Sequence, residues 1–254
     1  MTPTDIRAVF VDVGGTLLDQ HGNFYLANGQ DLTLAAIGKL AERGTVFGIV
    51  TGLAPSALAK RFTGASEAYL DLTAYAILEN GAAIYRSRGR RLSFGSEQLD
   101  QDWAAKFTKA RLELEFVARR LKEWELDFQK FDYSLRLDIE ENSLSESRLR
   151  ELLAWSTALI TARIARGFLI FCPADADKGD AVRFIAHSEG WRLADLMAMG
   201  NEDGDASFLE IVGHPRAPGN AKEGLKKLIL ERGGLVSDYF HGRAVYEFLS
   251  VLST

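Results

Sequence analysis

The apolar residues of this chain fall into two repeating patterns. Apolar runs within residues 8–11, 45–52 and 74–82 are typical of strands that are buried on both faces. Between them, residues 31–44 and a segment from about residue 55 show the apolar spacing of amphipathic helices. This alternation of strand and helix predicts a parallel sheet with helices on both faces.

The pattern changes between about residues 84 and 174. The expected elements there are a long helix at 101–126, an alternating strand at 133–140, a short helix near 145–156, and strands at 158–165 and 168–173. Alternation of apolar and polar residues is typical of a sheet with one solvent-facing side. We therefore predict an α+β domain at residues 84–174, inserted into a core formed by residues 1–83 and 175–254.

The core pattern returns after the insertion. Residues 177–191 have helical spacing, with Lys178 in the first turn, and residues 193–200 predict another strand. An acidic loop, NEDGD, follows at residues 201–205. The predicted fold class is α/β, with a Rossmann-like parallel-sheet core and an inserted α+β domain.

The composition is that of a soluble globular protein, with 47% hydrophobic and 26% charged residues. The net charge of −5 argues against a nucleic-acid partner, so the basic run at residues 86–91 is interpreted as an exposed hairpin edge or a local anion contact. No apolar stretch is long enough for a membrane span and no signal-peptide pattern is present, so we expect a cytoplasmic location. The single cysteine, Cys172, excludes an intramolecular disulfide and is expected to be a buried thiol. The oligomeric state is not indicated.

Four polar features stand where a predicted strand ends or a predicted helix begins: Asp12, Thr51, Lys178 and the NEDGD loop. Taken singly, each has an ordinary explanation as a turn, a solvated lysine or a surface loop. The carboxyl ends of parallel strands meet at one edge of the sheet, where ligands bind, so we expect these features to be neighbours. A carboxylate, a lysine and a hydroxyl are the groups that phosphoryl transfer requires for attack and charge stabilisation.

The motifs resemble those of the haloacid dehalogenase (HAD) superfamily. The resembling segments are DVGGTLLD at residues 12–19, VTG at 50–52, ENGA at 79–82, DKGDAV at 177–182, GNEDGD at 200–205 and GNAKEGLKKL at 219–228. Together with YFHGRAVYEFL at residues 239–249 and the inserted domain, they are similar to the branch of sucrose-phosphate, trehalose-phosphate and mannosyl-3-phosphoglycerate phosphatases. The resemblance spans nearly the whole chain and implies that the inserted domain is a cap.

The resemblance also implies roles for individual residues. Asp12 is expected to be the nucleophile that forms an aspartyl-phosphate, with Thr51 and Lys178 as its catalytic partners. The phosphate is expected to bind Thr51, Gly52 and Lys178. The implied cofactor is Mg²⁺, with the ligands Asp12, Gly14, Asn201 and Asp205. The expected partner is a small phosphorylated metabolite, such as a sugar or polyol phosphate.

This chain departs from the family pattern beside the nucleophile. Gly14 stands where family phosphatases carry a second aspartate, which acts as general acid and base. Glycine retains a carbonyl for the metal but has no side chain to transfer a proton. General acid–base catalysis typically contributes about 10²–10⁴-fold, so slow hydrolysis is expected unless a group such as Glu202 replaces the acid.

The acidic loop at residues 201–205 and the turn at residues 51–53 depart from the family pattern as well. Asn201 replaces the expected aspartate, and Gly204 replaces the asparagine that helps to position the lysine. Glu202 or Asp203 could serve as ligands if the register of the loop differs. Leu53 stands where the family often has arginine, so a cationic contact to the substrate is missing.

Three functions are compatible with these residues. A phosphohydrolase ranks first because Asp12, Thr51 and Lys178 are all retained. A catalytically impaired descendant that binds a phosphorylated ligand or a partner protein ranks second. A different HAD chemistry ranks third, because phosphonate- and haloacid-cleaving relatives also lack the second aspartate.

The four histidines do not have the spacing of metal ligands, so we expect them at the surface or in the core. They are His21, His187, His214 and His241.

Overall fold

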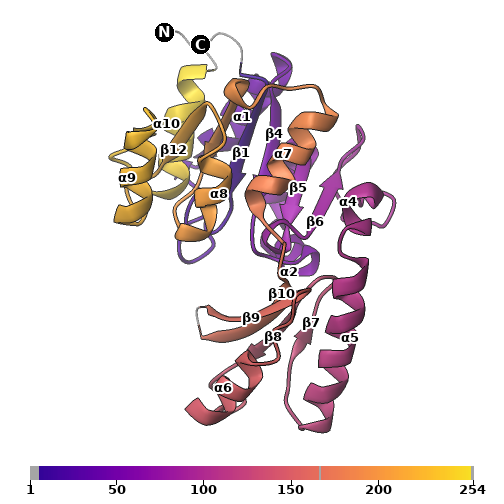
Figure 1. The fold of residues 1–254 in the computed structure, drawn as a ribbon. Helices are drawn as coiled ribbons and strands as arrows, with labels where there is room; N and C mark the ends of the chain where they lie inside the picture. The colour runs from indigo at the N-terminus through magenta and orange to yellow at the C-terminus, as the bar shows by residue number, and fades with distance from the viewer. Residues whose placement is uncertain (1–5, 166, 253–254) are drawn as a thin grey trace. The chain divides into compact units, whose positions relative to one another are not determined.

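The computed structural model describes residues 6–165 and 167–252. The expectation that the amino terminus carries no signal peptide concerns residues that lie partly outside this range. The chain divides into two compact units, Met1–Leu99 with Asp177–Thr254, and Asp100–Ala176 (Figure 1). The first boundary differs from the one expected at residue 84. Strand β6 (Ala83–Arg86) pairs with β5 (Thr73–Leu78), and Tyr85 of β6 also pairs with Leu99, so residues 83–99 stay with the first unit.

The first unit contains a mixed, mainly parallel sheet. Across the sheet, its strands are β13 (Leu235–Val236), β12 (His214–Ala217), β11 (Leu196–Met199), β1 (Ala8–Asp12), β4 (Val46–Val50), β5 and β6. All neighbouring pairs are parallel except β5 with β6. Every residue of β1 and β11 is buried, as their continuous apolar sequences predict.

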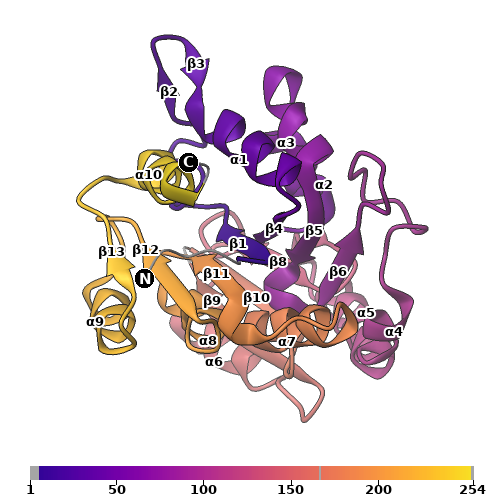
Figure 2. The ribbon, with the colours of Figure 1, turned by 90° about the horizontal axis from the view of Figure 1, so that it is seen from above.

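Helices cover both faces of this sheet. They are α1 (Leu32–Glu42), α2 (Pro55–Arg61), α3 (Ala68–Leu72), α7 (Lys178–Ser188), α8 (Ala206–Leu209), α9 (Glu223–Glu231) and α10 (His241–Leu252). Figure 2 shows α1 and α10 on one side of the sheet and α7 and α8 on the other. The predicted α/β fold class with a Rossmann-like core is confirmed. A small hairpin, β2 (Leu26–Ala27) with β3 (Gln30–Asp31), precedes α1.

The second unit is an antiparallel sheet in the order β7 (Gln129–Lys130), β8 (Leu135–Asp138), β10 (Phe168–Pro173), β9 (Ile160–Ala165). Helices α5 (Thr108–Glu123) and α6 (Glu146–Leu153) contribute to the same hydrophobic core as its strands. The alternating burial of β8 follows its alternating sequence.

The prediction of one long helix at residues 101–126 was wrong. The structure has α4 (Gln101–Ala105) and α5, separated by a turn at residues 106–107. The hydroxyl of Thr108 donates to the Ala105 carbonyl (3.0 Å), a local bond that competes with helical pairing. Phe107 is buried and packs edge-on against Trp103 and Tyr133, which holds the turn in place.

Three smaller expectations concern surface and core residues. Cys172 is buried, as predicted. In the basic run, Arg91 forms ion pairs with Asp71 and Glu67, and Arg86 pairs with Glu189, so these arginines are neutralised within the first unit. Across the described residues, no helix combines the length and apolarity that a membrane crossing requires.

Candidate active site

The candidate residues follow neighbouring strands at the carboxyl edge of the first unit's sheet. Asp12 is the last residue of β1, and it pairs in register with Val50, the last residue of β4. Thr51 is therefore one residue beyond the strand partner of Asp12. On the other side of β1, Val11 pairs with Met199, the last residue of β11, so Asn201 lies two residues beyond that strand. The registers of β1 with β4 and with β11 therefore place the segments that follow these three strands at the same edge of the sheet.

Lys178 reaches this edge because it is the first residue of α7. The side chain of Asp177 caps the helix by accepting the Asp180 N–H (2.9 Å). Gly81, with φ of +101°, lies against this helix start, and a Cβ there would be 2.2 Å from the Asp177 carbonyl oxygen. Only glycine permits this close approach, which fixes the ENGA loop against the start of α7.

A buried lysine joins two buried carboxylates. Lys178 Nζ donates to Asp12 Oδ1 (3.1 Å) and to Asp205 Oδ1 (2.6 Å). The lysine is 6% exposed, Asp12 6% and Asp205 1%. Burial alone would lower the pKa of Lys178, but the charges and hydrogen bonds of Asp12 and Asp205 raise that pKa above its ordinary value. The lysine is therefore held as a cation beside the Asp12 carboxylate.

Asp205 is fully engaged by donors from the chain. Its Oδ1 accepts from Lys178, and its Oδ2 accepts the N–H groups of Asn201 and Glu202, each at 2.9 Å. Gly200 allows this loop to close, since a Cβ there would lie 2.6 Å from the Asp205 Cβ. Both oxygens of Asp205 therefore accept hydrogen bonds from the chain, which orients this carboxylate toward Lys178.

Thr51 and Gly52 form a tight turn after β4. Thr51 is 3% exposed. Its N–H donates to the Ile77 carbonyl (2.8 Å), and its hydroxyl oxygen accepts the Leu53 N–H (3.2 Å). A Cβ at Gly52 would be 2.8 Å from the Asn80 side-chain oxygen. A larger residue at position 52 would therefore displace the Asn80 side chain, and the turn holds the hydroxyl oxygen of Thr51 beside the Leu53 N–H.

Asn201 lies against the loop that follows the candidate nucleophile. Its Oδ1 accepts the Thr16 hydroxyl (2.9 Å), and both residues are buried. A Cβ at Gly15 would be 2.4 Å from the Asn201 side-chain nitrogen, so the second glycine of DVGG makes room for this amide. Gly15 also has φ of +88°, a conformation that favours glycine.

Two residues that the sequence analysis did not assign to the site anchor the same loop. The Gly15 carbonyl accepts the Asn220 side-chain N–H (2.8 Å) and lies 3.0 Å from His241 Nδ1. Asn220 Oδ1 in turn accepts the His241 backbone N–H (2.9 Å). His241 was expected to be a surface or core residue. Its position at the start of α10 was not readable from spacing, because residues 15 and 241 meet only through the fold.

The sequence model of the haloacid dehalogenase-like hydrolase family matches residues 95–233, which is more than half of the chain. The chain belongs to this family.

Two relatives of the chain are phosphatases by name. A phosphoglycolate phosphatase of Sulfolobus acidocaldarius is 24% identical over 250 residues, which cover 98% of this chain and 97% of the relative. An HMP-PP phosphatase of Serratia proteamaculans is 27% identical over 225 residues, covering 78% of this chain and 80% of the relative. The sucrose-phosphatase of Synechocystis, whose crystal structure contains sucrose and phosphate, has the same fold, with a TM-score of 0.63, 17% identity and 97% of each chain covered.

The residues predicted to bind a metal offer only oxygen atoms, which suits Mg²⁺. Within the described part of the chain, no three His, Cys, Asp or Glu side chains are grouped as metal ligands. The oxygen donors of the predicted set are the carboxylates of Asp12 and Asp205, the Gly14 carbonyl and the Asn201 amide; Asp12 Oδ1, Asn201 Oδ1 and both Asp205 oxygens also accept hydrogen bonds within the chain. Mg²⁺ prefers oxygen ligands and keeps several waters, so this small set fits a hydrated Mg²⁺.

The alternative ligands in the acidic loop have another partner. Lys222 Nζ lies 3.0 Å from Asp203 and 3.5 Å from Glu202, and its side chain and that of Asp203 are more than half exposed. These carboxylates form a surface ion-pair cluster, so the geometry supports neither as a metal ligand. Glu202, whose side chain is 38% exposed, is also placed in this cluster and not beside Asp12.

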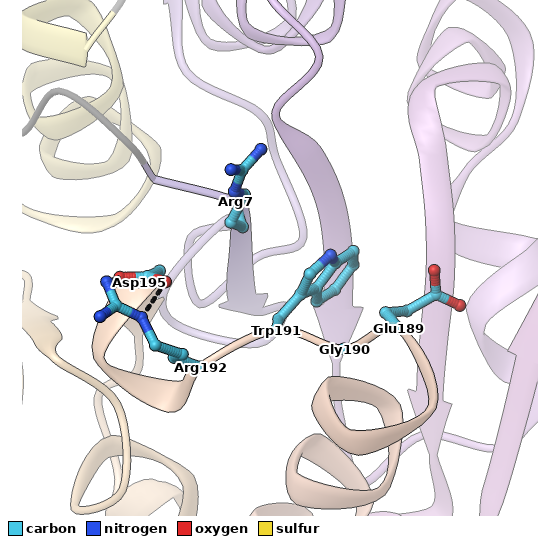
Figure 3. A pocket seen from close by; sticks show the side chains of 6 residues that line it. All are labelled: Arg7, Glu189, Gly190, Trp191, Arg192 and Asp195. Atoms are coloured by element: carbon cyan, nitrogen blue, oxygen red, sulfur yellow. Dashed lines mark hydrogen bonds and ion pairs between the residues drawn. The ribbon is translucent and has the colours of Figure 1, made fainter.

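A pocket opens at the opposite edge of the same sheet (Figure 3). It has a volume of about 440 Å³ and is lined by Arg7, Glu189, Gly190, Trp191, Arg192 and Asp195. Arg7 and Asp195 immediately precede β1 and β11. Asp12 and Asn201 lie at the opposite, carboxyl ends of these two strands. The pocket is therefore separated from the candidate HAD site by the length of the strands.

Proposed function

We propose that this HAD-like hydrolase is a phosphatase of small phosphorylated metabolites that acts through an aspartyl-phosphate on Asp12. The observation that carries the proposal is the buried contact of Lys178 with both Asp12 and Asp205 at the strand edge. The names of the two phosphatase relatives support the reaction class. Sugar and polyol phosphates are the proposed substrates, and the Asp100–Ala176 unit is the proposed cap domain.

The proposed reaction has two displacements at phosphorus. In the first, a carboxylate oxygen of Asp12 attacks phosphorus, and the bond from phosphorus to the ester oxygen breaks. The leaving oxygen takes its proton from solvent, because Gly14 offers no side chain to donate one. In the second, water attacks phosphorus, the bond to Asp12 breaks, and phosphate leaves with the carboxylate regenerated.

The neighbouring residues are proposed to bind and orient the phosphoryl group. The Lys178 ammonium stabilises negative charge on the transferring oxygens, and Asp205 keeps this ammonium in place. Thr51 and the N–H of Gly52 donate hydrogen bonds to the same oxygens. The Thr51 hydroxyl hydrogen is available for this role because the hydroxyl oxygen accepts, and does not donate, in its contact with Leu53.

Mg²⁺ is the proposed cofactor. Asp12, the Gly14 carbonyl, Asn201 and Asp205 would hold it, since these groups offer the oxygen donors that Mg²⁺ prefers. When bound, the ion supplies positive charge to the phosphoryl oxygens. Asn201 contributes a neutral amide in place of a carboxylate, so the affinity for Mg²⁺ is expected to be low.

The test of this function is to measure phosphate release from a panel of phosphorylated metabolites in the presence of Mg²⁺. We expect phosphate release by the wild type from at least one small phosphate ester, and none by Asp12→Asn. Release that persists in Asp12→Asn would contradict the proposal. The second candidate, a binding protein without turnover, is favoured specifically by Gly14. It would be supported if no ester were hydrolysed while a sugar phosphate raised the melting temperature.

A further inference from the structure

The pocket at the amino ends of β1 and β11 is formed by the first unit alone. It lies between the start of β1 and the segment that joins α7 to β11 (Figure 3). All six lining residues belong to the unit of Met1–Leu99 with Asp177–Thr254. The volume of about 440 Å³ is in the range of small-molecule sites, about 300–1,000 Å³. The pocket can therefore hold a ligand independently of the strand edge that carries Asp12.

Arg7 presents a cation to this pocket from a fixed backbone. Its N–H donates to the Asp195 carbonyl and its carbonyl accepts the Val46 N–H, both at 2.9 Å. The side chain is exposed, and within the described ranges its guanidinium takes part in no hydrogen bond or ion pair. The neighbouring carboxylate of Asp195 is held by Arg192 through two hydrogen bonds, at 2.8 and 2.6 Å. The guanidinium of Arg7 is therefore available to an anionic group, and phosphate is the anion that its geometry matches well.

Glu189 presents a hydrogen-bond acceptor to the same pocket. Its Oε1 accepts from the Tyr75 hydroxyl (2.5 Å) and from an N–H of Arg86 (3.0 Å), which fixes the side chain. Its Oε2 has no partner among the residues that the structure describes, and the side chain is 33% exposed. An ionised carboxylate oxygen accepts but does not donate, so Oε2 matches an N–H group of a ligand.

Trp191 supplies an aromatic surface between these two groups. Figure 3 shows its ring between the side chains of Arg7 and Glu189. The backbone N–H of Trp191 donates to the Ala186 carbonyl (2.8 Å), and the indole meets the Tyr75 ring edge-on, with centroids 6.2 Å apart. Tyr75 therefore holds both the indole and the Glu189 carboxylate. A half-buried indole offers a platform on which a planar ring can stack.

We propose that this pocket binds a nucleoside monophosphate whose base carries an amino group. The base stacks on Trp191, the amino N–H donates to Glu189 Oε2, and the phosphate pairs with the Arg7 guanidinium. Inorganic phosphate would leave the indole and the carboxylate without a partner, and an organic cation would be repelled by Arg7. The site is additional to the proposed phosphatase site and does not depend on it.

The first test is titration calorimetry of AMP with the full chain in EDTA, since the strand-edge site is proposed to use Mg²⁺. We expect a Kd below about 1 mM, and binding about tenfold tighter than that of adenosine, which lacks the phosphate. Arg7→Met should weaken the binding of AMP to that of adenosine. Arg183→Met on α7, whose side chain is 51% exposed, is the control and should bind AMP as the wild type does. No binding at about 1 mM AMP, or unchanged affinity in Arg7→Met, would overturn the inference.

The second test compares AMP with purine riboside 5′-monophosphate, which has hydrogen in place of the amino group. The wild type should prefer AMP by about tenfold. Glu189→Gln keeps an oxygen for the Tyr75 hydroxyl but turns an amide N–H toward the base, so it should abolish this preference. A preference that persists in Glu189→Gln would refute the assignment.

A third variant separates this site from the proposed phosphatase site. Asp12→Asn should bind AMP with the affinity of the wild type, because the pocket lies at the other ends of the strands. Loss of AMP binding in Asp12→Asn would assign the nucleotide to the strand edge and refute the pocket as its site. No turnover is measured, so the result stands whether or not the chain hydrolyses phosphate esters.

Discussion

Lys178 is held more closely by Asp205 than by Asp12, at 2.6 Å against 3.1 Å. The closer carboxylate receives two further backbone donors, whereas the more distant one is the candidate nucleophile at the end of β1. This arrangement indicates a division of roles between the carboxylates of Asp205 and Asp12. Asp205 accepts the shorter hydrogen bond and orients the ammonium, while the negative charge of Asp12 also stabilises it.

Replacing Asp205 tests this division. Asp205→Asn keeps the size of the side chain but removes the charge that holds Lys178. We expect kcat to fall by at least about tenfold, and the free energy of unfolding to fall by up to about 3 kcal/mol, since a buried cation loses a partner. Asp203→Asn is the matched control, because the Asp203 side chain is 71% exposed. Similar effects of both substitutions, measured by steady-state kinetics and urea unfolding, would contradict this role.

The raised pKa of Lys178 gives a prediction for pH dependence. Burial opposes the charge, but Asp12 and Asp205 more than compensate and raise the pKa. A group with a raised folded pKa contributes stability that is complete below its unfolded pKa, about 10.4 for lysine, and is lost only as pH rises through the higher folded value. Lys178 should therefore cause no alkaline loss of kcat below about pH 10. An alkaline limb near pH 8–9 that disappears in Lys178→Arg would be inconsistent with this account.

The strand edge could be predicted from sequence because its signals are local. The apolar run that ends at Asp12 and the helix that begins at Lys178 are each visible within a few residues, and parallel pairing brings their ends together. The anchoring of Gly15 by Asn220 and His241 could not be predicted, because it depends on contacts across more than 200 residues of sequence. The break before α5 was missed because buried aromatic packing, and not glycine or proline, produces it.

The metal set was also only partly accessible from sequence. The resemblance implies Asp205 as a Mg²⁺ ligand, but a motif does not show that both of its oxygens also accept hydrogen bonds from the chain. The contacts of Asp205 with Lys178, Asn201 and Glu202 depend on how the loop after β11 closes. The end of the first unit's first segment at Leu99 could not be predicted for a similar reason, since the pairings of β6 with β5 and of Tyr85 with Leu99 are tertiary contacts.

Gly14 is expected to limit the rate on esters with poor leaving groups. Gly14→Asp should raise kcat on alkyl phosphates by up to about 10²–10⁴-fold, because it restores a side chain that can protonate the leaving oxygen. Aryl phosphates need little protonation and should gain much less. The measurement is the ratio of the two gains under saturating Mg²⁺, and equal gains on both classes of ester would show that the general-acid explanation is wrong.

The anchor on Gly15 should influence the rate more than substrate binding. Asn220→Asp keeps the acceptor for the His241 N–H but loses the donor to the Gly15 carbonyl. We expect kcat to fall by about tenfold with little change in KM, because the loop after Asp12 loses its fixed position. His241→Phe should act in the same direction, while His187→Phe at the exposed end of α7 serves as the control. A change confined to KM would argue against a positioning role.

The account as a whole depends on a covalent bond between Asp12 and phosphorus. Mass spectrometry of the peptide that contains Asp12, after acid quenching during turnover of an aryl phosphate, tests this bond most directly. We predict that the wild type carries one phosphoryl group on Asp12 and that Asp12→Asn carries none and has no turnover. Turnover by the wild type without phosphorylation of Asp12, combined with undiminished turnover by Asp12→Asn, would contradict the proposed mechanism.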